Sequence, residues 1–246
     1  MTQSRLPALP VRLFRLETDI RLYGLDLSVL SDAALFEACY RAMPEERKQK
    51  IDRMRFAEGK RQSLGAGALL SYALTHCGLD DLSYAVTADP NGKPRIEPLY
   101  DRFRFNLSHT GDRAFCAVSF SPEGKAREVG CDVEHMTGAR YAVAERFFAP
   151  EEAAMLLATS NEEAKRDTFF CLWTLKESFI KATGLGFHCP LNSFRLGFGE
   201  EGTVSIYQTV TDGRFSFWEK REGDYRYACC VKTDEGAEPE AFEACD

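Results

Sequence analysis

The segment Glu128–Glu134, with the sequence EVGCDVE, constrains this chain more than any other part of it. Apolar residues alternate in it with Asp132 and Glu134, which are two positions apart. This alternation has the period of a β-strand, so the pattern predicts that both carboxylates lie on one face of a strand. On its own, such a pair is also typical of a solvated strand face. A second feature is therefore needed to indicate chemistry.

The second feature is the segment Trp173–Lys181, with the sequence WTLKESFIK. It predicts a helix in which Glu177 and Lys181, four positions apart, lie on one side. On its own, this pair is also typical of a surface helix, where it contributes about 0.3 kcal/mol. If the helix packs on the strand, three carboxylates and two lysines converge. Hard oxygen donors suit a magnesium ion that also holds a phosphate chain, so the two segments together predict a phosphate-transfer site.

The order of these motifs is that of the 4′-phosphopantetheinyl transferases, and the chain resembles the larger, Sfp type, which activates peptide and polyketide synthases. The resemblance extends from about residue 44 to about residue 231. Three further segments carry it: Gly92-Lys93-Pro94, Phe105–Thr110, with threonine where serine is usual at its end, and the run Gly184–Phe194.

The resemblance implies an α+β fold of two similar halves related by a pseudo-twofold axis, with the site between them. The pattern of strand, helices and strands occurs twice along the chain, and the turn Ser121–Lys125 is the expected boundary. The expected domains are residues 1–120, residues 126–232 with the metal motifs, and an acidic, disordered tail at 233–246. Helices are expected at 31–43 (with Ser31 as N-cap), from 44, and at 64–77, 142–148, 151–158 and 162–183. Strands are expected at 11–14, 20–25, 83–87, 104–107 and 115–120, from 129, near 194, and at 204–209, 214–219 and 225–231.

The composition is that of an ordinary soluble protein. Hydrophobic residues make up 44% of the 246 residues and charged residues 28%. No apolar run approaches the length of about 18 residues that a membrane span needs, and the first residues lack the features of a signal peptide. The nine cysteines contain no Cys-x-x-Cys pair. We therefore interpret them as reduced thiols of a cytoplasmic protein, rather than as a disulfide framework or a zinc site.

The net charge of −7 is unevenly distributed. The last 13 residues carry six acids and no basic residue, so the rest of the chain is close to neutral. The segment Arg41–Arg61 has eight basic residues against four acidic ones. Such an excess suits a polyanionic small molecule or an acidic protein, and nucleic acid is not expected because no recognised binding motif accompanies it. A solvated, charge-mixed helix is the alternative interpretation.

By resemblance, the chain is expected to transfer 4′-phosphopantetheine from coenzyme A to a serine of an acyl or peptidyl carrier domain, releasing adenosine 3′,5′-bisphosphate. The implied metal ligands are Asp132, Glu134 and Glu177, holding Mg²⁺, with Mn²⁺ as an alternative. Glu177 is also the candidate base for the incoming serine, directly or through a water. Lys181 would stabilise or protonate the departing phosphate, and Lys176 is expected to contact phosphate as a compact charge.

The implied coenzyme A pocket uses other residues. Gly92 would let the backbone come close to the ligand, and Lys93 with Pro94 would wall the adenine. Ser108 and His109 would offer a hydroxyl and a nitrogen donor to phosphate.

The 3′-phosphate of coenzyme A would be bound by Arg47, Lys50 and Arg61. The sequence departs from the family pattern here, because Glu46 lies where a basic residue is common. This departure leaves the assignment of the three basic residues open.

Two other classes of function fit the same motifs. A magnesium-dependent phosphohydrolase would use the three carboxylates on water and turn over coenzyme A without a carrier. A non-catalytic coenzyme A-binding protein would be favoured if a ligand were missing, and none is.

The segment Phe147–Leu157 is either an apolar patch for docking a carrier or an ordinary core helix. A chain with two halves can build its site as a monomer.

Overall fold

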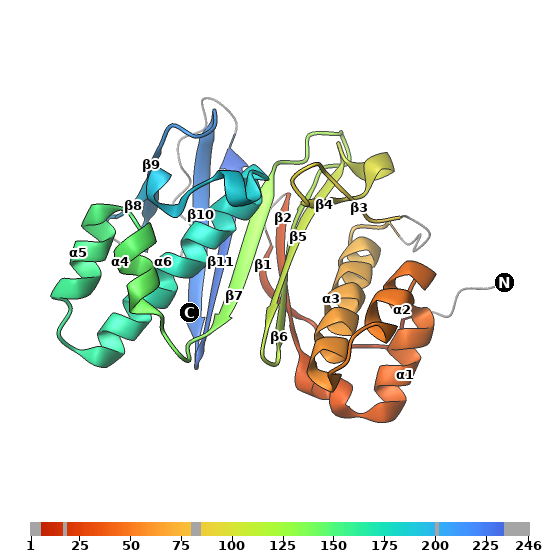
Figure 1. The fold of residues 1–246 in the computed structure, drawn as a ribbon. Helices are drawn as coiled ribbons and strands as arrows, with labels where there is room; N and C mark the ends of the chain where they lie inside the picture. The colour runs from red at the N-terminus through yellow and green to blue at the C-terminus, as the bar shows by residue number, and fades with distance from the viewer. Residues whose placement is uncertain (1–5, 17–18, 80–84, 200–201, 234–246) are drawn as a thin grey trace. The chain divides into compact units, whose positions relative to one another are not determined.

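The computed structural model describes residues 6–16, 19–79, 85–199 and 202–233. The chain forms two compact units, Met1–Thr87 with Pro94–Ala126, and Ala88–Lys93 with Arg127–Asp246 (Figure 1). The division thus falls after residue 126 instead of within 121–125, and residues 88–93 group with the second unit, which the sequence did not indicate. The acidic tail from residue 234 onwards lies outside the described residues.

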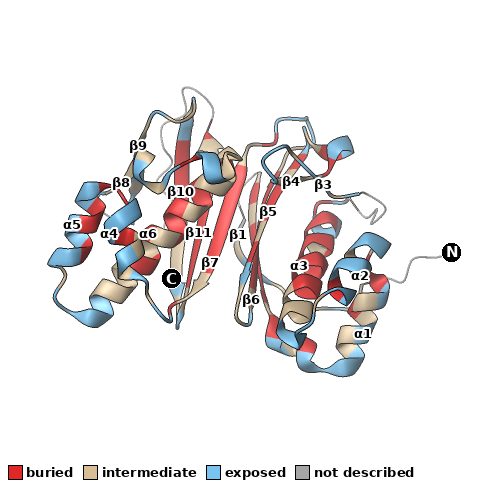
Figure 2. Ribbon diagram, in the orientation of Figure 1, coloured by how far each residue is buried: buried red, intermediate tan, exposed pale blue. Residues whose placement is uncertain are grey.

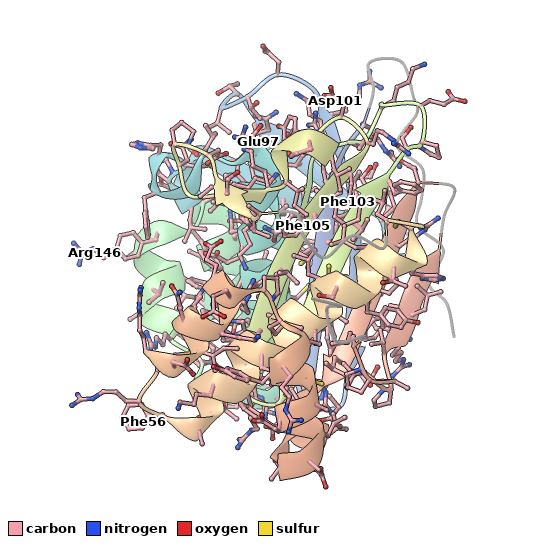
Figure 3. The ribbon with its side chains drawn as sticks, turned by 90° about the vertical axis from the view of Figure 1, so that its right-hand side faces the viewer. Phe56, Glu97, Asp101, Phe103, Phe105 and Arg146 are labelled. Atoms are coloured by element: carbon pink, nitrogen blue, oxygen red, sulfur yellow. The ribbon has the colours of Figure 1, made fainter. Side chains whose placement is uncertain are left out.

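The first unit is an antiparallel sheet with the strand order β1-β2-β6-β5, and helix α3 packs on it. Phe103 and Phe105 of β5 belong to its buried core, whereas Phe56 before α3 is 78% exposed (Figures 2 and 3). Its elements are β1 (Arg12–Leu16), β2 (Ile20–Asp26), the 3₁₀ helix η1 (Leu27–Ser31), α1 (Ala33–Ala42), α2 (Glu45–Asp52), α3 (Ala57–His76), β3 (Thr87–Ala88, shared with the second unit), β4 (Pro94–Arg95), η2 (Glu97–Leu99), β5 (Phe103–Thr110) and β6 (Arg113–Phe120).

Some element boundaries in this unit differ from those expected. Asp32, not Ser31, caps helix α1, because its carboxylate accepts a hydrogen bond from the amide of Leu35 at 2.7 Å. Helix α3 begins at Ala57, seven residues before the apolar periodicity starts, because its polar first turns do not show that pattern. The expected strand at 83–87 lies largely outside the described residues.

The second unit is an antiparallel sheet with the strand order β10-β11-β7, covered on one face by helix α6. A small two-stranded sheet, β8-β9, and two short helices complete it. Its elements are β7 (Val129–His135), α4 (Tyr141–Phe147), α5 (Pro150–Ala158), α6 (Glu162–Thr183), η3 (Gly186–His188), η4 (Leu191–Ser193), β8 (Phe194–Phe198), β9 (Val204–Gln208), β10 (Arg214–Glu222) and β11 (Tyr225–Thr233).

Helix α6 has the bounds predicted from the sequence. It begins after Asn161, whose side chain accepts a hydrogen bond from the amide of Ala164 at 2.9 Å. It ends at Gly184, which adopts a left-handed conformation (φ 68°) that suits glycine. Its apolar face packs on the sheet, where the Phe179 and Phe215 rings meet edge to face at 4.9 Å. The chain is thus an α+β protein, and no helix within the described residues is long and apolar enough to cross a membrane.

The backbones of β7 and α6 come unusually close at Gly130. A Cβ atom at this position would lie 2.1 Å from the carbonyl oxygen of Ser178 and 2.2 Å from the amide nitrogen of Ala182. Both atoms belong to the helix backbone, which cannot rotate away as a side chain can. Gly130 therefore sets how closely the helix lies on the strand.

We expect Gly130→Ala to lower the free energy of unfolding by about 1–3 kcal/mol, the usual cost of overpacking, because the helix must move off the strand. Gly59→Ala is a matched control, since an added Cβ there meets only the Met54 sulfur at 3.6 Å. This change lies within helix α3 and should be neutral or stabilising by up to about 1 kcal/mol. Urea unfolding measures both variants. An unchanged midpoint for Gly130→Ala would contradict the close approach.

Candidate active site

The polar face of β7 meets one side of α6. Gly130, Asp132 and Glu134 alternate along the strand and so share the face on which Gly130 contacts the helix. The strand and the helix run in opposite directions, because Glu134 bonds to Trp173 near the middle of α6 while Gly130 lies against Ala182 near its end.

An ion pair joins the two elements at the centre of this contact. The Lys181 ammonium donates to Asp132 Oδ1 at 2.6 Å. Asp132 is only 3% exposed, so the alternative interpretation of a solvated strand face is wrong for this residue. Burial favours the neutral form of Lys181, but the charge and hydrogen bond of Asp132, together with the nearby Cys131 and Glu177, outweigh it, and the pKa of Lys181 is raised. Lys181 is therefore a protonated cation at neutral pH.

The other two acids are held in a less favourable environment. Trp173 Nε1 donates to Glu134 Oε1 at 3.2 Å. Burial and, next, the charge of Asp132 raise the pKa of Glu134 to about 7. The same two causes, in the same order, raise the pKa of Glu177. The three carboxylates are therefore close enough to repel one another, and a cation would relieve that repulsion.

The chemistry of this donor set fits a hard divalent cation such as Mg²⁺. The set is not arranged as a finished coordination sphere, however. Within the residues that the structure describes, no three acidic, histidine or cysteine side chains gather closely enough to hold a metal ion. Binding would therefore require at least one of the two glutamates, each on a two-carbon stem, to change rotamer toward Asp132.

Residues 88–93 lie against the end of α6. The Lys93 ammonium donates to Glu128 Oε2 at 2.6 Å and to the carbonyl oxygen of Ala182 at 2.9 Å. Lys93 thus binds the last turn of the helix, where a cation is favourable. Gly92 has a φ of 90°, a conformation that favours glycine, in a turn closed by the Asp89 carboxylate. Pro94 follows at the start of β4.

Lys176 does not fit its expected role. Its side chain is fully buried, and its ammonium donates to Glu152 Oε2 at 2.8 Å and to the carbonyl oxygens of Leu191 at 2.9 Å and Phe194 at 3.0 Å. An ammonium has three donors, and these partners use all of them. This arrangement corrects the expectation that Lys176 contacts phosphate, and it makes Lys176 a structural residue that ties α6 to α5 and to the start of β8.

The remaining predicted residues belong to the first unit. Arg47 on α2 is half-buried, and its stem and Nε would lie within 3.4 Å of a Cβ added at Gly67 of α3. Arg61 on α3 is 3.9 Å from Asp112 Oδ1. Lys50 is exposed in the last turn of α2. On β5, Ser108 is buried and the neighbouring His109 is exposed, and strand alternation places them on opposite faces.

Sequence reasoning missed several contacts that shape the site. Trp173 was recognised as the start of a motif, but its hydrogen bond to Glu134 was not predicted. The sequence also gave no sign that Lys93 pairs with Glu128 or that Lys176 pairs with Glu152. Each pair joins residues 24 or more positions apart. In helix α5, Leu156 is buried while Phe147 before it is exposed, so this region contains both core and surface apolar residues.

Comparison with known proteins places the chain in a family. The model of the 4′-phosphopantetheinyl transferase superfamily matches residues 128–230. A 4′-phosphopantetheinyl transferase of Bacillus subtilis is 31% identical over 216 residues, which cover 86% of this chain and 92% of that protein. The 4′-phosphopantetheinyl transferase HetI of Nostoc sp. is 31% identical over 189 residues, covering 72% and 73%. The chain belongs to the 4′-phosphopantetheinyl transferase family, and it is an enzyme of that class.

A solved structure matches a smaller part of the chain. The holo-[acyl-carrier-protein] synthase of Thermotoga maritima covers 48% of this chain and 76% of its own, at 20% identity and a TM-score of 0.37. A score this low carries no argument about the site.

The raised pKa of Glu134 predicts a pH-dependent effect on stability. The folded protein binds the proton of this acid more tightly than the unfolded chain does. Its contribution to stability is therefore greatest below pH 4.5 and is lost as the pH rises toward about 7. Glu134→Gln has no proton to lose, so its gain in melting temperature over the unmodified protein should be larger at pH 8 than at pH 5, in EDTA. One kcal/mol corresponds to about 2–4 °C in a protein of this size.

Glu151→Gln is the control for this prediction, because Glu151 is an exposed acid on α5. It should show no comparable difference between the two pH values. A Glu134→Gln effect that is the same at pH 5 and pH 8 would contradict the unfavourable environment inferred for Glu134.

Proposed function

We propose that this enzyme transfers 4′-phosphopantetheine from coenzyme A to a serine hydroxyl of an acyl or peptidyl carrier domain. The serine oxygen forms a bond to the pyrophosphate phosphorus that carries the pantetheine arm. The bond from that phosphorus to the bridging oxygen breaks, and adenosine 3′,5′-bisphosphate leaves. The observation that carries the proposal is the strand–helix pair on which Asp132, Glu134, Glu177 and Lys181 converge, in a chain that belongs to this family.

Asp132, Glu134 and Glu177 are the proposed holders of Mg²⁺, with Mn²⁺ as an alternative. When bound, the metal supplies Lewis-acid stabilisation of charge on the phosphates. The proposal is supported by the environment of the two glutamates, because burial and, next, the charge of Asp132 raise the pKa of both. Asp132 also orients Lys181 through their ion pair at 2.6 Å.

Lys181 is proposed to neutralise the departing phosphate. Its pKa is raised, so it is charged at neutral pH, and phosphoryl transfer depends on neutralising charge in the transition state. Its side chain is 28% exposed, unlike the buried Lys176, so its ammonium can still reach a ligand.

Glu177 is proposed to take the proton of the attacking serine, directly or through a water. An ordinary glutamate is a weak base at neutral pH because its pKa lies far below 7. Burial and the charge of Asp132 raise the pKa of Glu177, which makes its carboxylate a better match for general-base catalysis.

Coenzyme A is the proposed donor. Lys93 and Pro94 are proposed to wall the adenine beside the turn at Gly92, and Ser108 and His109 to bind phosphate. The proposed partners of the 3′-phosphate are Arg47, Lys50 and Arg61. Lys176 is left out of this set because its three donors are used inside the protein.

The proposed partner is an apo-carrier domain. The protein is proposed to be a monomer and to act in the cytoplasm. Two units in one chain can supply all the proposed residues, which supports a monomer. Seven of the eight cysteines in the described part of the chain are buried, which suits a compartment in which thiols stay reduced.

Intact-mass analysis tests the reaction. Apo-carrier domains of fatty acid, polyketide and nonribosomal peptide systems are incubated with the enzyme, coenzyme A and Mg²⁺, and one carrier should gain the mass of one phosphopantetheine. A parallel incubation without carrier should leave coenzyme A intact. Consumption of coenzyme A there, with no carrier modified, would instead indicate a phosphohydrolase. Binding with neither reaction would indicate a non-catalytic protein.

Glu177→Gln separates the metal role of this residue from its role as base. Glutamine keeps the length and one oxygen donor but cannot accept a proton at neutral pH. We expect the rate to stay about 10²–10⁴-fold below that of the unmodified enzyme at saturating Mg²⁺, the usual range for a lost general base. Glu145→Gln is the control, because Glu145 is an exposed acid on α4 outside the segment Phe147–Leu157, and it should keep the full rate. Recovery of near-normal turnover at high Mg²⁺ would reduce Glu177 to a ligand.

A further inference from the structure

The indole of Trp173 bonds to a carboxylate of the proposed site. Its Nε1 donates to Glu134 Oε1 at 3.2 Å, joining helix α6 to strand β7. An indole has one N–H donor and no acceptor, so it can hold one carboxylate oxygen and no more. The bond therefore uses one carboxylate oxygen of Glu134, Oε1, and leaves the other, Oε2, for a second partner.

Aromatic stacking fixes the ring that carries this donor. The Trp173 ring stacks on Phe148 at a centroid distance of 6.2 Å and an interplanar angle of 24°. It also stacks on Phe169 at 6.1 Å and 18°. Both phenylalanines are buried, at 3% and 4% exposure. Because the indole cannot turn without breaking these contacts, its N–H points in a set direction.

Trp173 also belongs to the functional side of its helix. Glu177 and Lys181 follow it at intervals of four residues, so the three side chains lie along one side of α6. Trp173 is the member of this row that reaches Glu134, while Lys181 reaches Asp132. The helix therefore contacts both carboxylates of the strand through side chains that start from one rigid element.

We propose that Trp173 is a positioning residue, whose indole N–H holds the Glu134 carboxylate in the orientation in which it binds the divalent cation. This inference rests on the proposed role of Glu134 as a metal ligand. Glutamate has three side-chain torsions, and fixing them before the cation arrives reduces the entropy lost on binding.

The test compares variants that lose the N–H and keep the ring. Trp173→Phe removes the donor and preserves an aromatic ring beside Phe148 and Phe169. Trp218→Phe is the matched control, because Trp218 is 7% exposed and pairs with Cys229, which places it on the sheet face opposite to Asp132. Mn²⁺ binding is measured by electron paramagnetic resonance without coenzyme A and without carrier, so no turnover is involved. Circular dichroism melting checks the fold.

We expect Trp173→Phe to weaken Mn²⁺ binding by about tenfold or more, the lower end of the 10–100-fold loss usual for an outer partner of a metal ligand. Trp218→Phe should bind as the unmodified protein does. In a Glu134→Ala background, Trp173→Phe should cause no further loss, because the two residues act as one unit. Unchanged affinity in Trp173→Phe, or a further loss in the Glu134→Ala background, would overturn the proposal.

If Trp173→Phe does not fold, benzothienylalanine at position 173 replaces it, since sulfur takes the place of the N–H while the fused ring is kept. The same tenfold loss is expected, and unchanged affinity overturns the proposal here too. Absence of Mn²⁺ binding by the unmodified protein is a distinct result. It would remove the proposed metal site itself, and with it the inference about Trp173.

Discussion

The contact of two backbones at Gly130 is the constraint on which the site depends. A helix packed on a sheet is normally held away by side chains from both elements. Here the strand has no side chain at the point of contact, and a Cβ would lie 2.1 Å from the helix backbone. The resulting approach is what allows Lys181 to reach Asp132 at 2.6 Å. The glycine of the strand motif is therefore as much a part of the site as the acids that follow it.

The spacing of the two motifs follows from the geometry of a strand and a helix that run in opposite directions. Two residues of a strand advance about 6.6 Å, and four residues of a helix advance about 6 Å. Steps of two along β7 from Gly130 to Glu134 therefore keep pace with steps of four back along α6 from Lys181 to Trp173. Each motif alone is ambiguous. Together they give two rows of side chains, one on the strand and one on the helix, with nearly equal spacing. This is why their joint occurrence predicts the contact of strand and helix better than either motif does.

The candidate site gathers three acidic side chains, whereas elsewhere in the second unit a buried acid is paired with a lysine. The Lys176–Glu152 pair is fully buried, and each member has further hydrogen bonds to the backbone. By contrast, burial and, next, the charge of Asp132 raise the pKa of both Glu134 and Glu177, as at many functional sites. The buried pair fixes the frame, since it ties α6 to α5 and to β8. The frame can then hold three acids in positions where burial and neighbouring negative charge disfavour ionisation of the two glutamates.

The sequence predicted the elements well where local rules decide them, and failed where the direction of a side chain around a helix matters. Caps at Asn161 and Gly184 fix both ends of α6, and both are readable from the residues themselves. Lys176 and Lys181 look alike in the sequence, but five residues turn a helix by about 140° beyond one full turn. One lysine therefore faces the core and Glu152, and the other faces Asp132. Which side of the helix meets the strand is set by Gly130, a contact between residues about 50 positions apart, and no local pattern around either lysine encodes it.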